Sequence, residues 1–244
     1  MLTNYIEALN LTKRYKDLLA LDHISFSVSP GEIFTMLGGN GAGKTTTINL
    51  FLNFIDPTDG EARINGISVQ KEPLKAKKSV AFVSENVMLY TNFTAIQNLD
   101  YFSKLGGKTK LTDNDFKRAL FRVGLQEEAH NKKLKEFSKG MRQKCGVAIA
   151  ILKDAQVILL DEPTSGLDPQ AGFEFISLIR SLRDEGKAIL MSTHDIFRAK
   201  EISDTIGIMK EGRLVMKSSR GELKNKDLEE LYLHYMAGGR EQVN

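Results

Sequence analysis

The chain has 244 residues, of which 41% are hydrophobic and 27% are charged. This composition is typical of an ordinary globular protein, and it excludes a disordered, collagen-like or disulfide-stapled chain. No uncharged stretch is apolar enough to cross a bilayer, which takes ~18 or more apolar residues. The longest one, from Asn86 to Leu99, is full of Asn, Thr and Gln. We therefore expect a chain that stays in water.

The charges argue against a nucleic-acid partner. Lys and Arg total 34 and Asp and Glu total 31, which leaves a net charge of +3, and the two signs are interspersed along the chain. Such a pattern gives no broad positive field for nucleic acid. The single Cys145 cannot form an internal disulfide, and Glu7, Lys13 and Arg14 interrupt the segment where a signal peptide needs an apolar run. These features predict a cytoplasmic location.

The first third of the chain predicts strands around one glycine-rich loop. Short apolar or alternating runs between charged or Pro-Gly turns are typical of strands. The runs are Tyr5 to Leu11, His23 to Val28 and Glu32 to Leu37. After the loop, helical apolar spacing runs from Thr45 to Phe54, where Asp56-Pro57 stops it. The pair Asn65-Gly66 predicts a hairpin.

The middle third predicts an inserted helical unit. It follows a buried strand from Ser79 to Val83, and its helices are expected at Thr94 to Leu105, Asp113 to Val123 and Gly140 to Lys153. Strands and helices then alternate, which predicts a parallel α/β sheet. The strands are Val157 to Leu160, Ala188 to Ser192 and Thr205 to Lys210; the helices are Pro169 to Arg183 and Ile196 to Ser203. A short amphipathic helix, Leu228 to Met236, ends the pattern.

The glycine-rich loop fits the phosphate-loop pattern, in the required position between a strand and a helix. Its residues are Gly38, Gly39, Asn40, Gly41, Ala42, Gly43, Lys44 and Thr45. The glycines let backbone amides turn toward a polyphosphate, and the following helix presents its positive end to the same anion. Lys44 is expected to pair with the β and γ phosphates, Thr45 to bind Mg²⁺, and Thr46 to reach the next phosphate oxygen.

Two acids follow the buried strand Val157 to Leu160. Asp161 is expected to hold the Mg²⁺ shell, and Glu162 to polarise the attacking water as a general base. Acids at strand ends also cap helices, but the upstream phosphate loop favours the nucleotide role. The expected fold class is α/β: a phosphate-loop NTPase core with a mostly parallel sheet, an N-terminal antiparallel β portion and an inserted helical subdomain.

From Tyr15 to His194 the ordered motifs resemble the ATP-binding subunits of ABC transporters, and some details occur in export-type members. Phe137-Ser138-Lys139-Gly140-Met141-Arg142-Gln143 resembles the signature segment of that family. Ser165-Gly166-Leu167-Asp168 resembles its D-loop, and Ser192-Thr193-His194-Asp195 resembles its switch histidine. The resemblance implies ATP and Mg²⁺ as cofactors, and a single domain over 1–244. Within it, 1–85 and 155–215 would form the core, 86–154 the helical signature subdomain and 216–244 a C-terminal tail.

The resemblance also implies roles for residues far from the phosphate loop. ATP would lie between two nucleotide domains, a second copy or a homologue, so that Ser138, Gly140 and Met141 act on the partner's ATP, with Asp168 at the same interface. Tyr15 would stack on adenine, although such a Tyr can equally be simple packing, and His194 would contact the γ phosphate. The family implies separately encoded transmembrane permease subunits, which would hold this subunit at the inner face of the cell membrane.

Several residues depart from the family pattern. Glu85 stands where most members have a Mg²⁺-coordinating Gln, so we predict altered Mg²⁺ dependence or slower turnover. Lys139 replaces a usual Gly, Met141 a usual Gln, and Gly39 a common Pro, without loss of a phosphate donor. Two alternative functions stay open: a soluble ABC-type ATPase in cofactor assembly, and a nucleotide-gated interaction module with slow turnover.

Overall fold

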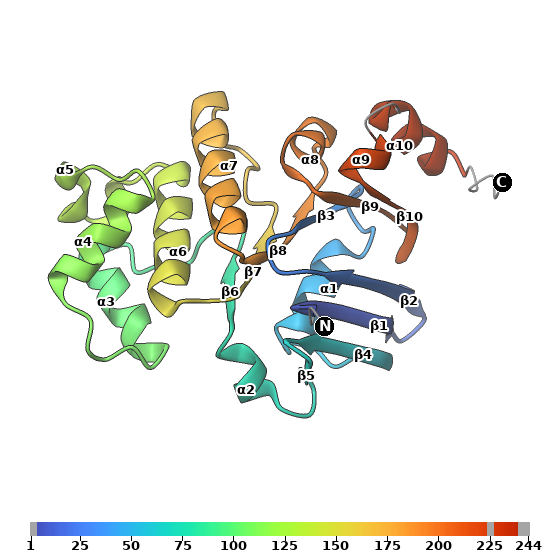
Figure 1. The fold of residues 1–244 in the computed structure, drawn as a ribbon, viewed down its shortest axis with the longest axis horizontal. Coiled ribbons are helices and arrows are strands. Elements are labelled where there is room, and N and C mark those ends of the chain that lie inside the picture. The colour runs from blue at the N-terminus through green and yellow to red at the C-terminus, as the bar shows by residue number, and fades with distance from the viewer. Residues whose placement is uncertain (1–3, 224–226, 239–244) are drawn as a thin grey trace.

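Two sheets with an inserted helical unit beside them make up the protein. The computed structural model describes residues 4–223 and 227–238. A four-stranded sheet has the order β2-β1-β4-β5, and a six-stranded sheet has the order β10-β9-β3-β8-β7-β6 (Figure 1). Helices α3 to α6 lie at one end of the molecule, and α1 lies next to the smaller sheet (Figure 1). The predicted α/β fold class is therefore confirmed.

The smaller sheet is antiparallel throughout. Its strands are β1 (Ile6–Tyr15), β2 (Leu18–Val28), β4 (Asp59–Ile64) and β5 (Ile67–Ser68). The predicted hairpin is confirmed: Asn65 and Gly66 have φ of 51° and 73°, as a tight two-residue turn requires. The first two strands are longer than predicted because they stay paired out to Tyr15 and Leu18, where they meet at a tight turn at Lys16.

The larger sheet is parallel except at one edge. Its strands are β3 (Ile33–Leu37), β6 (Val80–Val83), β7 (Val157–Asp161), β8 (Ala188–Thr193), β9 (Thr205–Lys210) and β10 (Arg213–Ser219). All residues of β3 are buried, as expected for a central strand covered on both faces. The unpredicted β10 pairs antiparallel with β9. The proposed boundary between core and tail, 215/216, falls inside this strand, so the sheet continues to Ser219.

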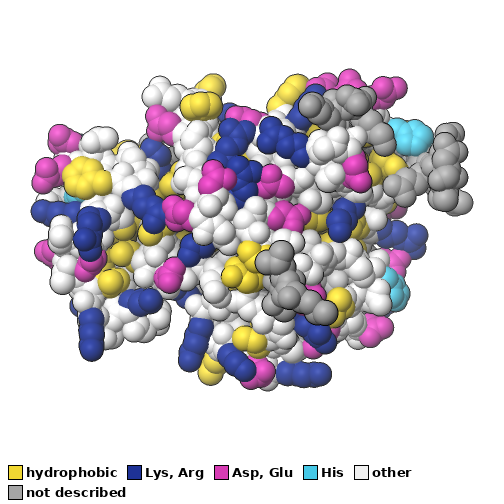
Figure 2. All heavy atoms as spheres, in the orientation of Figure 1, with side chains coloured by type: hydrophobic (Ala, Val, Ile, Leu, Met, Phe, Trp, Pro, Cys, Tyr) yellow, Lys and Arg dark blue, Asp and Glu magenta, His cyan; other side chains and the backbone are white. Residues whose placement is uncertain are grey.

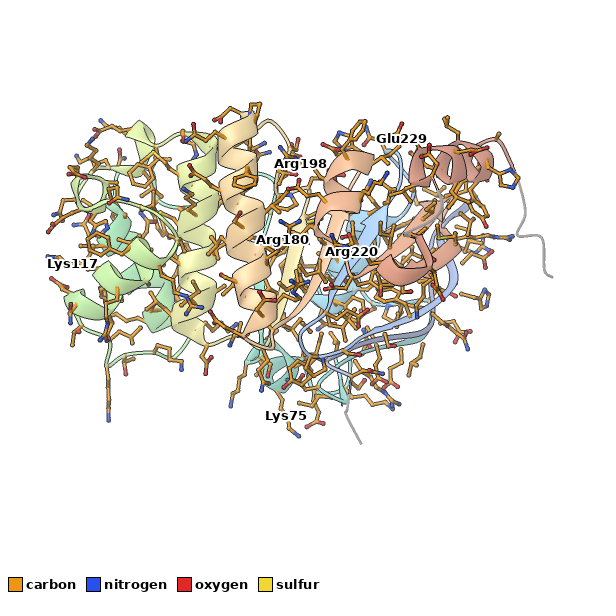
Figure 3. The ribbon with its side chains drawn as sticks, turned by 45° about the horizontal axis from the view of Figure 1, so that its top comes forward. Lys75, Lys117, Arg180, Arg198, Arg220 and Glu229 are labelled. Carbon is orange, nitrogen blue, oxygen red and sulfur yellow. The ribbon has the colours of Figure 1, made fainter. Side chains whose placement is uncertain are left out.

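Helices cover the larger sheet and connect it to the smaller one. They are α1 (Lys44–Phe51), α2 (Pro73–Lys77), α7 (Pro169–Asp184), α8 (Ile196–Ile202), α9 (Arg220–Leu223) and α10 (Leu228–Met236). Arg180 and Arg198 lie between α7 and α8 (Figure 3), where Arg180 donates to the Glu201 carbonyl. The tail helix α10 packs on its own domain, because Leu228 and Tyr235 are buried against the sheet.

The inserted unit contains α3 (Ala95–Leu105), α4 (Asp113–Arg122), α5 (Glu127–His130), the 3-10 helix η1 (Leu134–Glu136) and α6 (Lys139–Lys153). Thr112 caps α4 through a reciprocal capping box with Asp115. The hydrogen bonds from Thr112 lower the pKa of Asp115 to about 2. Cys145 is buried in the core of this unit, and burial raises the pKa of its thiol to about 12.

The surface shows no broad field of one charge on the face in Figure 2, where basic and acidic side chains are interspersed. In the part of the chain that the structure describes, no helix is long and apolar enough to span a bilayer.

Candidate functional site

A cavity of about 510 Å³ lies at the phosphate loop, where β3 ends and α1 begins. Four predicted residues from other segments also line it: Tyr15, Glu85, Asp161 and Glu162. The structure therefore brings the predicted residues from four separate segments of the sequence to one cavity, which Glu211, a residue that was not predicted, also lines. This location, at the carboxyl ends of parallel strands, is the usual ligand site of an open α/β sheet.

The loop wraps around the ammonium group of Lys44. That side chain is only 6% exposed, and its Nζ donates to the carbonyls of Gly38 at 2.6 Å and Gly39 at 3.1 Å. Gly41 and Gly43 have φ of 78° and 103°, a region that glycine adopts without a steric penalty. The loop conformation thus depends on glycine, and its centre is a buried positive charge.

Gly38 and Gly39 offer a matched test of this packing. A Cβ at Gly38 would lie 2.5 Å from the Met209 carbonyl oxygen, whereas a Cβ at Gly39 would have no atom within 4 Å. We expect Gly38→Ala to lower the free energy of unfolding by about 1–3 kcal/mol through overpacking. Gly39→Ala should stay within ~0.5 kcal/mol of the parent. Chemical denaturation measures both, and equal stabilities of the two variants would contradict the described packing.

The two acids after β7 turn to different partners. The Asp161 Oδ1 accepts from the Thr45 hydroxyl at 3.3 Å and from the Ser192 hydroxyl. The Glu162 carboxylate lies 3.4 Å from the Lys44 Nζ through Oε1, and 2.9 Å from the His194 Nδ1 through Oε2. Glu162 has a φ of 47°, which is unusual for a residue other than glycine.

A capping role for these two acids does not fit the structure. The next helix, α7, is capped by Asp168, whose carboxylate accepts from the Ala171 amide at 2.9 Å. Asp161 and Glu162 instead face Thr45, Lys44 and His194, at the cavity. Asp161 therefore lies beside a hydroxyl group, and Glu162 lies between an ammonium group and an imidazole nitrogen.

Tyr15 lies at the end of β1 and at the edge of the cavity. Its ring is 42% exposed, and the Lys13 Nζ lies 4.9 Å from the ring centroid. A Tyr that only filled core space would be buried, so this exposure leaves a ring face available to a ligand.

The predicted signature residues are at the start of α6 and do not line the cavity. Ser138 is the N-cap, and its hydroxyl oxygen accepts from the Met141 amide at 3.2 Å. Gly140 is buried, and a Cβ there would lie 3.2 Å from the Ala171 side chain. Within one chain, the signature therefore does not complete the site around the phosphate loop.

Glu85 has a partner that the sequence did not predict. Its Oε1 accepts from the Ser165 hydroxyl at 2.9 Å and lies 3.4 Å from the Lys139 Nζ. The Ser165 hydrogen bond and the Lys139 ammonium lower the pKa of the Glu85 carboxyl. Of the three predicted metal ligands, Thr45 and Asp161 contact each other, whereas Glu85 contacts other residues. The sequence did contain a signal for this contact: positions 85 and 139 both depart from the family pattern, and the residues found there carry opposite charges.

The family model described as "ABC transporter" matches residues 21–165 of the chain. The chain belongs to the ABC transporter family. It is an ATP-binding domain of that family, and the match covers the phosphate loop, the signature segment and the acids after β7.

Several relatives of this ABC domain are named ATP-binding proteins. The bacitracin transport ATP-binding protein BcrA of Enterococcus faecalis is 36% identical over 224 residues, which are 91% of this chain and 71% of BcrA. The probable multidrug ABC transporter ATP-binding protein YbhF of Escherichia coli K12 is 34% identical over 90% of this chain. The chain spans only 38% of the length of YbhF.

A solved structure of an ATP-binding cassette has the same fold as this chain. The dimeric structure of the ATP-binding cassette MJ0796, in a post-hydrolysis state with ADP and Pi, matches with a TM-score of 0.78 and 26% identity. The match covers 88% of this ABC domain and 98% of that cassette.

Proposed function

We propose that this ABC domain hydrolyses ATP as a dimer and thereby drives transport through separate transmembrane permease subunits. The observation that carries the proposal is the contact of Glu162 with both Lys44 and His194 at the cavity of the phosphate loop. A phosphate-binding lysine beside a carboxylate is the arrangement that phosphoryl transfer to water requires. The reaction would convert ATP and water into ADP and phosphate.

Mg²⁺ is the metal that the family implies, and the residues present fit it. Thr45 and Asp161 offer a hydroxyl and a carboxylate, the hard oxygen donors that Mg²⁺ prefers. Among residues 4–223 and 227–238, no three His, Cys, Asp or Glu side chains form a group that could hold a metal. Mg²⁺ would therefore take its other ligands from phosphates and water, and Glu85 lies in the same cavity as a further oxygen donor. When bound, the ion neutralises charge on the phosphates.

Residues of the chain would bind the phosphates, activate the attacking water and hold the adenine ring. Lys44 would exchange its carbonyl acceptors in the loop for the β and γ phosphates, and Thr46 would contact the next phosphate oxygen. Glu162 would orient the attacking water and accept its proton on the carboxylate. His194, bound to the other oxygen of Glu162, would contact the γ phosphate and keep that carboxylate oriented. Tyr15 would stack on the adenine ring.

A second nucleotide domain would complete each site. The signature residues Ser138, Gly140 and Met141 lie at a helix N-terminus outside the cavity of their own chain. Such a helix end suits an anion, and in a dimer it would face the ATP of the partner domain, with Asp168 at the same interface. A dimeric structure among the neighbours supports this arrangement. The domain would divide into a core, 1–85 and 155–215, a helical subdomain, 86–154, and a tail, 216–244, with the last strand of the core sheet running into this tail as far as Ser219.

The transport part of the proposal is supported by the names of the relatives, which include bacitracin transport and Nod factor export proteins. We infer an export-type transporter, with this subunit at the inner face of the cell membrane.

Co-purification tests the transport part. Membranes of the source organism are extracted in mild detergent, the chain is captured, and its partners are identified by mass spectrometry. We expect chains with several membrane spans, and faster ATP hydrolysis with them than without. Recovery of the chain only with soluble assembly proteins would contradict a transporter and favour the cofactor-assembly alternative.

A further inference from the structure

Three segments of the chain meet at one carboxylate beside the nucleotide cavity. Glu85 follows strand β6, Lys139 is the first residue of helix α6, and Ser165 follows strand β7. The Glu85 Oε1 accepts from the Ser165 hydroxyl at 2.9 Å and lies 3.4 Å from the Lys139 Nζ. Glu85 also lines the cavity of the phosphate loop. One side chain therefore contacts the nucleotide cavity and the helix that carries the signature.

The ion pair is supported from both sides. One turn further along α6, the fully buried Gln143 donates from Nε2 to the carbonyls of Ser84 at 3.0 Å and Glu85 at 2.8 Å. The Lys139 side chain also lies against the turn after Ser165, since a Cβ at Gly166 would be 3.5 Å from the Lys139 Nζ. The backbone of residue 85 is thus held by α6, and the Lys139 side chain lies close to the turn at Gly166, which limits the entropy lost when the pair forms.

Helix α6 contains no Asp or Glu, so the acid that pairs with Lys139 must come from another segment. Within the described ranges, Glu85 is the one acid in ion-pair contact with it, across 54 residues of sequence. The side chains of Lys139 and Glu85 are 27% and 45% exposed, so the pair is partly shielded from water.

We propose that Glu85, Lys139 and Ser165 form a clamp that positions the N-terminal end of α6 relative to the nucleotide cavity of the same chain. This inference rests on the proposed function, because the end of α6 would meet the ATP of a partner domain. Lys139 is a positioning residue here, since it acts through the placement of Ser138 and Gly140, whereas Glu85 both lines the nucleotide cavity and pairs with Lys139. The clamp would connect the nucleotide cavity of a chain to the end of α6, the surface of the same chain that would contact the partner domain.

A double-mutant cycle tests the clamp. Glu85→Gln, Lys139→Gln and the double variant are prepared in a Glu162→Gln parent, and the ATP concentration at half-maximal dimerisation is measured by light scattering. Partly exposed ion pairs are weak, so we expect each single variant to need roughly 2- to 5-fold more ATP. The double variant should need no more than the single variants, because both remove the same contact. Lys144→Gln, on the same helix as Lys139, breaks an ion pair with Glu174 of α7 and should match the parent.

A second readout separates positioning from other roles. Binding of a fluorescent ATP analogue to the monomer should be unchanged in Lys139→Gln, because Lys139 does not line the cavity. Additive effects of the two substitutions, or a Lys139→Gln variant that dimerises like the parent, would overturn the clamp. A Glu162→Gln parent that binds ATP but never dimerises would instead overturn the proposed function.

Discussion

Replacement of Glu162 by Gln is expected to lower the steady-state rate of ATP hydrolysis roughly 10²- to 10⁴-fold, the usual contribution of a general base. The Glu162 carboxylate lies between the Lys44 Nζ at 3.4 Å and the His194 Nδ1 at 2.9 Å, at the edge of the nucleotide cavity. A carboxamide of the same size keeps this position but cannot accept a proton from water. ATP binding should therefore survive while turnover is lost.

Phosphate release from purified protein measures the effect. Glu185→Gln is the matched control, because Glu185 is 45% exposed and pairs with Arg122 away from the cavity. The control should keep the rate of the parent. A Glu162→Gln variant that hydrolyses ATP as fast as the control would show that Glu162 is not the base.

Replacement of Lys44 by Ala is expected to weaken ATP binding by about 100-fold. The buried Lys44 Nζ forms hydrogen bonds to two loop carbonyls and lies beside Glu162, so a phosphate would meet a preplaced positive charge. Charge-assisted hydrogen bonds contribute about 1.5–3 kcal/mol each. Loss of two such bonds costs about 3 kcal/mol or more, which is about two powers of ten in the dissociation constant.

Titration with a fluorescent ATP analogue checks this value. Lys104→Ala removes an equal charge from an exposed ion pair with Asp100 on α3 and should leave the affinity unchanged. Thermal denaturation of both variants distinguishes lost binding from lost folding. A folded Lys44→Ala variant with the affinity of the parent would exclude the phosphate role of Lys44.

Long, periodic and buried elements were predictable from the sequence. The strands β3, β7 and β8 are short, mostly apolar runs because each is a central strand of the larger sheet and is buried on both faces. The helix α2, with five residues, and α5, with four, are too short for a period of 3.6 residues to show. Strand β10 also escaped prediction, since it is an edge strand whose residues are mostly half-buried or exposed.

The candidate site also has parts that were predictable from the sequence and parts that were not. The phosphate loop and the acids after β7 were predictable because each motif is contiguous and has a defined place after a strand. The contact of Glu85 with Lys139 joins residues 54 positions apart. Local periodicity carries no information on such a contact. The orientation of Glu162 toward Lys44 and His194 likewise depends on how three strands are placed side by side.

The mass of the Glu162→Gln variant in solution, with and without ATP in a buffer that contains Mg²⁺, tests the composite ATP site most directly. In the structure, the signature at the start of α6 lies outside the cavity of its own chain, and in the proposed function a second chain completes each site. Sedimentation equilibrium should give the mass of one chain without ATP and twice that mass at saturating ATP. A single-chain mass at saturating ATP, with the nucleotide bound, would contradict the shared site.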